Sequence, residues 1–126
     1  MDTLETVRLS ADLLWSRQGA EITILNVADL VGYTNYCLIL TAKNEKHAQA
    51  LISHLERRLR SLGIRALGRE GVKVGKWALV DFGEFVVHVF NPEERALYDL
   101  ERLWSEAPKV EWNPPKNVLQ SSGSNE

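Results

Sequence analysis

The stretch that decides the fold is residues 70–90, EGVKVGKWALVDFGEFVVHVF. Within it, residues 77–82 and 85–90 are two runs rich in the β-branched and aromatic residues that favour strands. Gly83 and Glu84 separate them, and a glycine at the first central position suits a two-residue type II′ turn. The stretch therefore predicts two adjacent antiparallel strands joined by a tight hairpin turn.

In that register the hairpin has one purely apolar face and one mixed face, because side chains alternate across a strand. The apolar face, which we expect on the core, comprises Ala78, Val80, Phe82, Phe85, Val87 and Val89. The mixed face comprises Trp77, Leu79, Asp81, Val86, His88 and Phe90. Asp81 and His88 are diagonal neighbours there, about 7–8 Å apart. A carboxylate so placed would favour the protonated form of the imidazole.

Three interpretations of the mixed face stay open from these residues alone. It can be a half-covered sheet face with a structural contact between Asp81 and His88. It can be a protein-binding patch, with Trp77 as aromatic anchor and Asp81 as directional acceptor. A catalytic acid–base pair is the weakest of the three, because no nucleophile accompanies these side chains.

Outside the hairpin, periodicity and capping signals predict the remaining elements. Apolar residues at three- and four-residue steps, begun by Asp2, Asn44 and Asn91-Pro92, predict three helices. The helices cover residues 3–18, 44–62 and 92–107, and further strands cover 21–27, 36–42 and 64–67, with a loop over 68–76. In the last helix, the buried stripe would be Ala96, Leu97, Leu100, Leu103 and Trp104. This order predicts an α/β (α+β) fold with a single mixed β-sheet of about five strands and helices packed on it.

Composition bounds the rest. The chain has 126 residues, which suits one domain over residues 1–107 followed by a Pro/Ser-containing tail over 108–126 that is disordered at its end. The formal net charge of -2 argues against a basic body that grips nucleic acid. Cys37 is the single cysteine, so an internal disulfide is excluded, and we expect it to be a buried small hydrophobe in a reducing compartment. No apolar run is long enough for a membrane span and no secretory signal is visible, which favours the cytoplasm.

Signatures of catalysis are missing. The glycines at 68, 71 and 75 are spaced wrongly for a phosphate-binding loop. His47 and His54 lie two helical turns apart and form no metal pattern with Cys37 or His88. We therefore expect a protein that is not an enzyme and that uses no cofactor and no metal.

Several motifs together resemble a known family. They are residues 67–71 (LGREG), Trp77, residues 80–84 (VDFGE), residues 87–90 (VHVF) and residues 95–104 (RALYDLERLW). Over roughly residues 3–107 the chain resembles the ribosomal silencing factor family, RsfS or Iojap.

This resemblance implies a fold related to nucleotidyltransferases without their catalytic signature. It implies binding to the large ribosomal subunit through large-subunit ribosomal protein fourteen, with little direct contact to nucleic acid. The bound factor would block joining of the small subunit and repress translation when nutrients are short, and the free protein would be a homodimer. A nucleotide-binding or nucleotidyltransferase-like enzyme relic is the alternative.

The resemblance also assigns roles to residues. Glu70, Trp77, Asp81 and His88 would form or border the partner patch, and Gly83 would serve the turn. The remaining two, Arg95 and Tyr98, would be either the rim of the patch or helix-to-sheet contacts. This sequence departs from the family by having Asn26 and Asn35 where Asp is frequent and Glu84 where Asp is usual.

Overall fold

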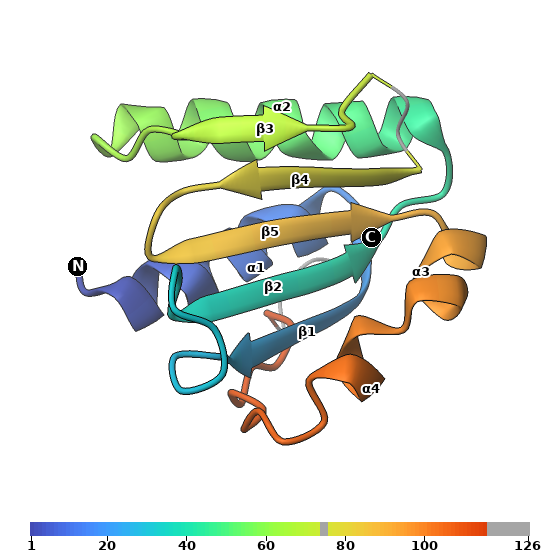
Figure 1. The fold of residues 1–126 in the computed structure, drawn as a ribbon. Coiled ribbons are helices and arrows are strands. Elements are labelled where there is room, and N and C mark those ends of the chain that lie inside the picture. Colours follow the sequence, from blue (N-terminus) through green and yellow to red (C-terminus); the bar gives the residue numbers. More distant parts are fainter. Residues whose placement is uncertain (74–75, 116–126) are drawn as a thin grey trace.

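The computed structural model describes residues 1–73 and 76–115, which form one mixed sheet flanked by helices (Figure 1). The strand order is β1-β2-β5-β4-β3, in which β2 and β5 run parallel and the other neighbours antiparallel. The strands are β1 (Ala20–Asn26), β2 (Tyr36–Thr41), β3 (Gly68–Glu70), β4 (Trp77–Asp81) and β5 (Phe85–Phe90). The helices are α1 (Thr3–Ser16), α2 (Glu45–Ser61), α3 (Pro92–Tyr98) and α4 (Leu100–Leu103). The predicted mixed α+β sheet is confirmed.

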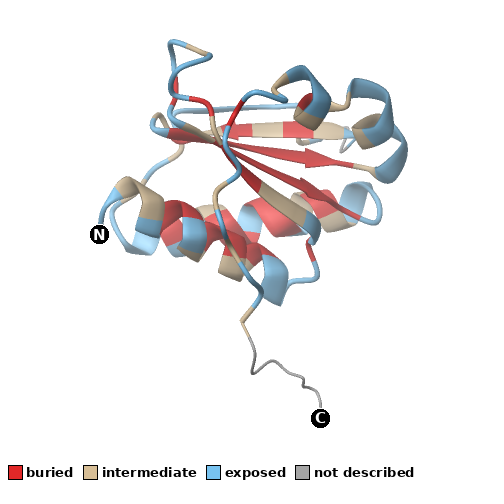
Figure 2. Ribbon diagram, turned by 90° about the horizontal axis from the view of Figure 1, so that it is seen from below, coloured by how far each residue is buried: buried red, intermediate tan, exposed pale blue. Residues whose placement is uncertain are grey.

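The sheet lies between two layers of helix (Figure 2). Helices α1 and α2 cover one face, and the main core fills the space between them and the strands. Helices α3 and α4 lie on the opposite face, beside a smaller cluster that includes Leu25, Ile39, Phe90 and Leu100. Among the described residues no helix is long and apolar enough to cross a membrane.

The hairpin has the predicted register. Val80 pairs with Val87 and Ala78 with Val89, and the Phe82 N–H donates to the Phe85 carbonyl at 2.9 Å. Gly83 has a φ of 90°, a conformation that glycine adopts without strain. All six residues of the predicted apolar face belong to the main core.

The three predicted helix starts are also confirmed. Asp2 and Glu5 form a reciprocal capping box at α1. Asn44 caps α2 by accepting from the His47 N–H, and Asn91 caps α3, which has proline in its first turn.

The predicted strand over 64–67 is wrong, because the third strand lies a few residues later, at the start of the predicted loop over 68–76. The third strand is Gly68–Glu70, whose three residues are all exposed. An exposed edge strand buries no side chain, so it leaves no hydrophobic pattern in the sequence. It is held instead by backbone pairing with β4, which begins where the Leu67 N–H donates to the Asp81 carbonyl at 2.7 Å.

The single predicted last helix is wrong as well. Asp99 adopts a left-handed φ of 48°, so the helix breaks into α3 and α4. The break divides the predicted stripe: Leu100 is buried, whereas Leu97 and Leu103 are 72% and 69% exposed. Leu62, at the C-cap of α2, is also exposed because it follows the last helical turn.

The chain continues along the sheet edge beyond residue 107. The Asn26 N–H donates to the Pro108 carbonyl at 2.9 Å, and the Val110 N–H donates to the Ile24 carbonyl at 2.8 Å. The Trp112 indole then donates to the Asp12 carboxylate at 2.8 Å. The division into a body and a tail at residue 107 stays a prediction, and residues 116–126 lie outside the described part of the chain.

Candidate partner-binding face

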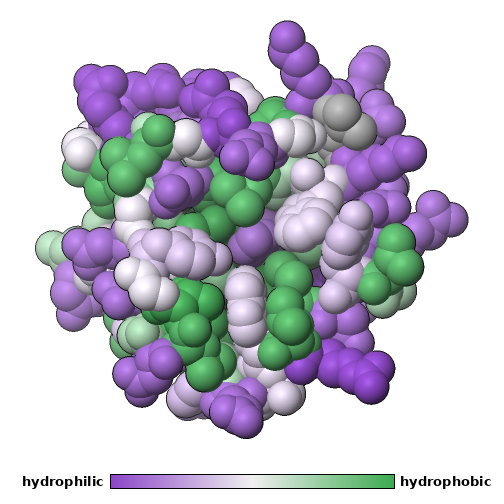
Figure 3. Space-filling view, in the orientation of Figure 1, coloured by the Kyte–Doolittle hydropathy of each residue, from purple (hydrophilic) through white to green (hydrophobic). Residues whose placement is uncertain are grey.

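The mixed side of the hairpin lies on the face of the sheet opposite α1 and α2, and we call it the front face. It comprises Glu70, Trp77, Leu79, Asp81 and His88 together with the neighbouring Tyr33 and Tyr98. Strand pairing places Glu70 opposite Leu79 and Gly68 opposite Asp81, so β3 extends this face. In Figure 3, apolar and aromatic side chains occupy much of the centre, and hydrophilic ones gather at the rim.

Trp77 is half-buried and is held from three sides. Its ring stacks on Phe90, with ring centroids 5.0 Å apart, and packs against Tyr98 at 4.4 Å. Its indole N–H donates to His88 Nδ1 at 3.2 Å. Tyr98 is 47% exposed, so the pair forms an aromatic surface that is fixed in place and still open to solvent.

His88 lies beneath this surface and is 5% exposed. Because Nδ1 accepts from Trp77, the proton belongs on Nε2, which faces the Cys37 sulfur at 3.9 Å. Burial lowers the pKa of His88 to about 4 and raises the pKa of the Cys37 thiol to about 12. The expectation of a protonated imidazole is therefore wrong: near neutral pH the imidazole is neutral and only weakly basic, and the thiol is protonated, which does not suit a nucleophile activated by a base.

Asp81 does not make the contact with His88 that its diagonal position predicted. Its Oδ1 accepts from the Gly83 N–H at 2.7 Å and so closes the hairpin turn. Tyr33, which is 66% exposed, is close enough to Asp81 to be affected by its charge. Desolvation first, and then Cys37 and Asp81, raise the pKa of this tyrosine. A carboxylate that is half-exposed beside a phenol can accept hydrogen bonds from a visiting partner.

Arg95 makes a helix-to-sheet contact, which is one of its two predicted roles. Its guanidinium donates to the Glu21 carbonyl at 2.5 Å and to the Thr41 hydroxyl at 3.0 Å. It also forms an ion pair with Glu101 at 2.6 Å, and its side chain is 13% exposed. Arg95 therefore ties α3 and α4 to β1 and β2. Tyr98, by contrast, is both a contact to Trp77 and part of the open surface.

Sequence reasoning missed an apolar surface beside Tyr98. The break at Asp99 leaves Leu97 and Leu103 exposed around an open hollow of about 500 Å³. The hollow is lined by Ala96, Leu97, Tyr98, Asp99, Arg102 and Leu103. Because Tyr98 belongs to both features, the hollow continues the front face. The sequence does not indicate the break, since no glycine or proline lies beside Asp99 and the apolar periodicity continues through it.

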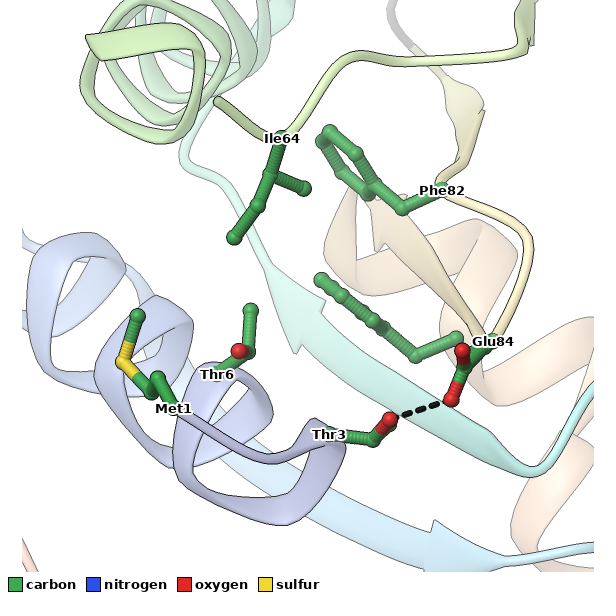
Figure 4. Close-up of a pocket in the computed structure, with 7 residues that line it drawn as sticks. Met1, Thr3, Thr6, Ile64, Phe82 and Glu84 are labelled. Carbon is green, nitrogen blue, oxygen red and sulfur yellow. Dashed lines mark hydrogen bonds between the residues drawn. The ribbon is translucent and has the colours of Figure 1, made fainter. Parts of the chain in front are cut away.

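A second hollow, of about 200 Å³, lies at the turn end of the hairpin (Figure 4). Ile64, Phe82 and Phe85 form its apolar wall, and the Thr3 hydroxyl donates to the Glu84 carboxylate at its mouth. This combination offers no acid–base pair. Over residues 1–73 and 76–115, no three His, Cys, Asp or Glu side chains gather as metal ligands would.

Together, the fold and the front face define a small α+β protein whose candidate site is a binding surface. Comparison with known proteins identifies the family. A family model described as "Ribosomal silencing factor during starvation" matches residues 1–126. A ribosomal silencing factor RsfS of Halalkalibacterium halodurans is 33% identical over 111 residues, covering 88% of this chain and 95% of that protein.

More distant relatives and solved structures agree as well. A crystal structure of a Chromobacterium violaceum protein superposes with a TM-score of 0.80 at 29% identity, covering 96% of this chain and all of that one. A mouse protein named "Mitochondrial assembly of ribosomal large subunit protein 1" is 29% identical over 102 residues, covering 79% of this chain and 45% of that protein. The chain belongs to the ribosomal silencing factor family. Membership implies ribosome-associated regulation, and the family is named for a regulator rather than for an enzyme.

Proposed function

We propose that this protein silences ribosomes by docking its front face on the large ribosomal subunit, through large-subunit ribosomal protein fourteen. The bound protein then excludes the small subunit by its bulk and so represses translation. It acts in the cytoplasm, and the free protein is a homodimer. The large subunit is favoured because the mouse relative is named for assembly of that subunit.

The observation that supports this proposal best is that Trp77 is held rigidly and is still partly exposed. Its ring is fixed by Phe90, Tyr98 and His88 and is still partly open to solvent. A rigid aromatic residue surrounded by apolar area loses little conformational entropy on binding, which is the character of an interface hot spot. Glu70 and Asp81 add negative charge to this face, which complements the basic surface typical of a ribosomal protein.

The test is co-sedimentation with purified large subunits through a sucrose cushion. Trp77→Ala is expected to weaken binding by roughly thirtyfold, which corresponds to about 2 kcal/mol for a hot spot. Trp15→Ala is the matched control, because Trp15 is 37% exposed on α1, on the other side of the sheet. Undiminished pelleting of Trp77→Ala would contradict the proposed docking face.

Since Trp77 also packs inside the protein, a second variant separates docking from folding. Leu97 is 72% exposed, so Leu97→Glu removes little internal packing. It should nevertheless weaken subunit binding while leaving the melting temperature close to that of the wild type. A subunit-joining assay with purified subunits then tests the mechanism: the wild type should lower the yield of joined ribosomes, and Trp77→Ala should not.

A further inference from the structure

Helix α2 carries an unbalanced charge on the side that faces away from the sheet. Its last two turns contain Arg57, Arg58 and Arg60, all exposed. Beyond Glu45 in its first turn, its one acid is Glu56, which accepts two hydrogen bonds from Arg69, each at 2.9 Å. The carboxylate best placed to neutralise the arginines is therefore already engaged by a residue of β3.

Arg17, at the end of α1, adds to the same surface. The two helices meet where the His47 ring lies 2.9 Å from the Arg17 carbonyl. Two turns further along α2, His54 is buried, and burial together with the charges of Arg17, Arg57 and Arg58 lowers its pKa. These three guanidinium groups therefore act on one point from two helices. We call Arg17, Arg57, Arg58 and Arg60 the basic helix face.

Among the described residues, no carboxylate lies within ion-pair distance of any of the four arginines. In the same part of the chain, the side-chain partner of Arg57 is the neutral Ser53 hydroxyl, to which it donates at 2.9 Å. Arg57 and Arg60 lie three residues apart, and like charges at that spacing disfavour a helix. In a chain whose formal net charge is -2, such a local excess of positive charge is suited to a polyanion.

We propose that the basic helix face binds the phosphate backbone of RNA. RNA is the polyanion a ribosome supplies, so the choice of partner rests on the proposed function. Arginine is well suited to phosphate because its planar group donates two parallel hydrogen bonds. The buried residues of α2 face the sheet, so its arginines point away from the front face. One molecule can therefore hold a protein partner on the front face and RNA on the basic helix face.

The test measures salt dependence, because each phosphate contact releases condensed counterions. Binding of a fluorescein-labelled RNA hairpin is followed by anisotropy across a salt series. Arg57→Gln/Arg58→Gln is compared with Arg8→Gln/Lys109→Gln, which removes the same charge from exposed residues of α1 and of the chain segment that pairs with β1. The first variant should bind about tenfold more weakly at low salt. The slope of its log affinity against log salt, which is negative, should become shallower by about 1–2. The second should resemble the wild type.

Equal losses in the two double variants would overturn the proposal, because they would show a response to net charge rather than to this face. Equal binding by Arg57→Gln/Arg58→Gln and the wild type would overturn it too. Co-sedimentation with large subunits separates this proposal from the proposed function. If the wild type binds the RNA hairpin through these arginines and does not pellet with large subunits, the proposed function fails and the RNA-binding face stands. Suppose instead that Trp77→Ala abolishes pelleting and that the arginine variant changes neither the affinity for the RNA hairpin nor the salt slope. Then the RNA-binding face fails and the proposed function stands.

Discussion

The two faces of the β4–β5 hairpin are built from adjacent residues and have opposite characters. The face toward α1 and α2 is apolar throughout and joins the main core. The front face holds Trp77, Asp81 and His88, each of which spends a hydrogen bond inside the protein. The polar groups of the front face therefore have a structural role first. They fix the proposed docking surface, on which Trp77 and Asp81 stay partly open to solvent while His88 is buried beneath them.

The largest expected effect comes from making the same change on both faces. Val87 is fully buried on the core face, whereas Leu79 is half-buried on the front face. Val87→Ser should lower the free energy of unfolding by about 3 kcal/mol, through lost packing and a buried hydroxyl. Leu79→Ser should lower it by about 1 kcal/mol. Urea unfolding followed by circular dichroism measures both, and equal losses would show that the front face is core after all.

The second effect is the pH dependence that His88 imposes. Its folded pKa of about 4 lies below the value of about 6.5 in an unfolded chain. Above pH 6.5 both states are neutral, so His88 contributes no pH dependence. Between about pH 6.5 and about pH 4 the unfolded state binds a proton that the folded state refuses, so stability falls as the pH falls. The loss reaches about 3 kcal/mol near pH 4.

The measurement is the unfolding free energy as a function of pH, for the wild type and for His88→Gln. Glutamine does not titrate, and its side-chain oxygen can still accept from the Trp77 indole. The wild type should lose more stability than the variant across this window. Parallel curves would mean that the imidazole is not desolvated as its 5% exposure indicates.

Most of the fold was predictable because it follows from burial and caps. Alternation along residues 77–90 gave the hairpin register, and Asp2, Asn44 and Asn91 gave the helix starts. The exposed strand β3 and the break at Asp99 were not predictable, because backbone pairing and a left-handed residue leave no periodic signal. At the site, the sequence indicated which hairpin residues share the mixed face, but it indicated neither their hydrogen-bond partners nor the contributions of Tyr33 and of the hollow beside Tyr98. A diagonal position shows that Asp81 and His88 are near each other, and only the coordinates show that each prefers another group.

The third effect compares two ion pairs, one on each side of the sheet. Arg95 pairs with Glu101 on the side of the front face, where its side chain is 13% exposed and also donates to backbone and hydroxyl oxygens. Arg69 pairs with Glu56 of α2, and its side chain is 53% exposed. Arg95→Ala should lower the unfolding free energy by about 2 kcal/mol, because it removes several hydrogen bonds at once and leaves the partly buried Thr41 and Glu101 oxygens without this donor. Arg69→Ala should lower it by less than about 1 kcal/mol.

Hydrogen exchange locates the consequence of losing Arg95. Amide protection in α3 and α4 should fall in Arg95→Ala, because that side chain ties both helices to β1 and β2. Protection of the core strands should be kept. Uniform loss of protection across the molecule would mean that the helices of the front face unfold only with the whole protein.

The smallest expected effect tests the turn. Asp81→Ala removes the acceptor of the Gly83 N–H and should cost about 1 kcal/mol of unfolding free energy. Asp81→Asn keeps a side-chain oxygen in place, so it should cost less, and it removes the charge from the front face. The pair separates the two roles of this residue: stability should follow the acceptor, and binding to the large subunit should follow the charge. If both variants bind subunits like the wild type, the carboxylate serves the hairpin turn alone, and recognition depends on the aromatic surface of Trp77 and Tyr98.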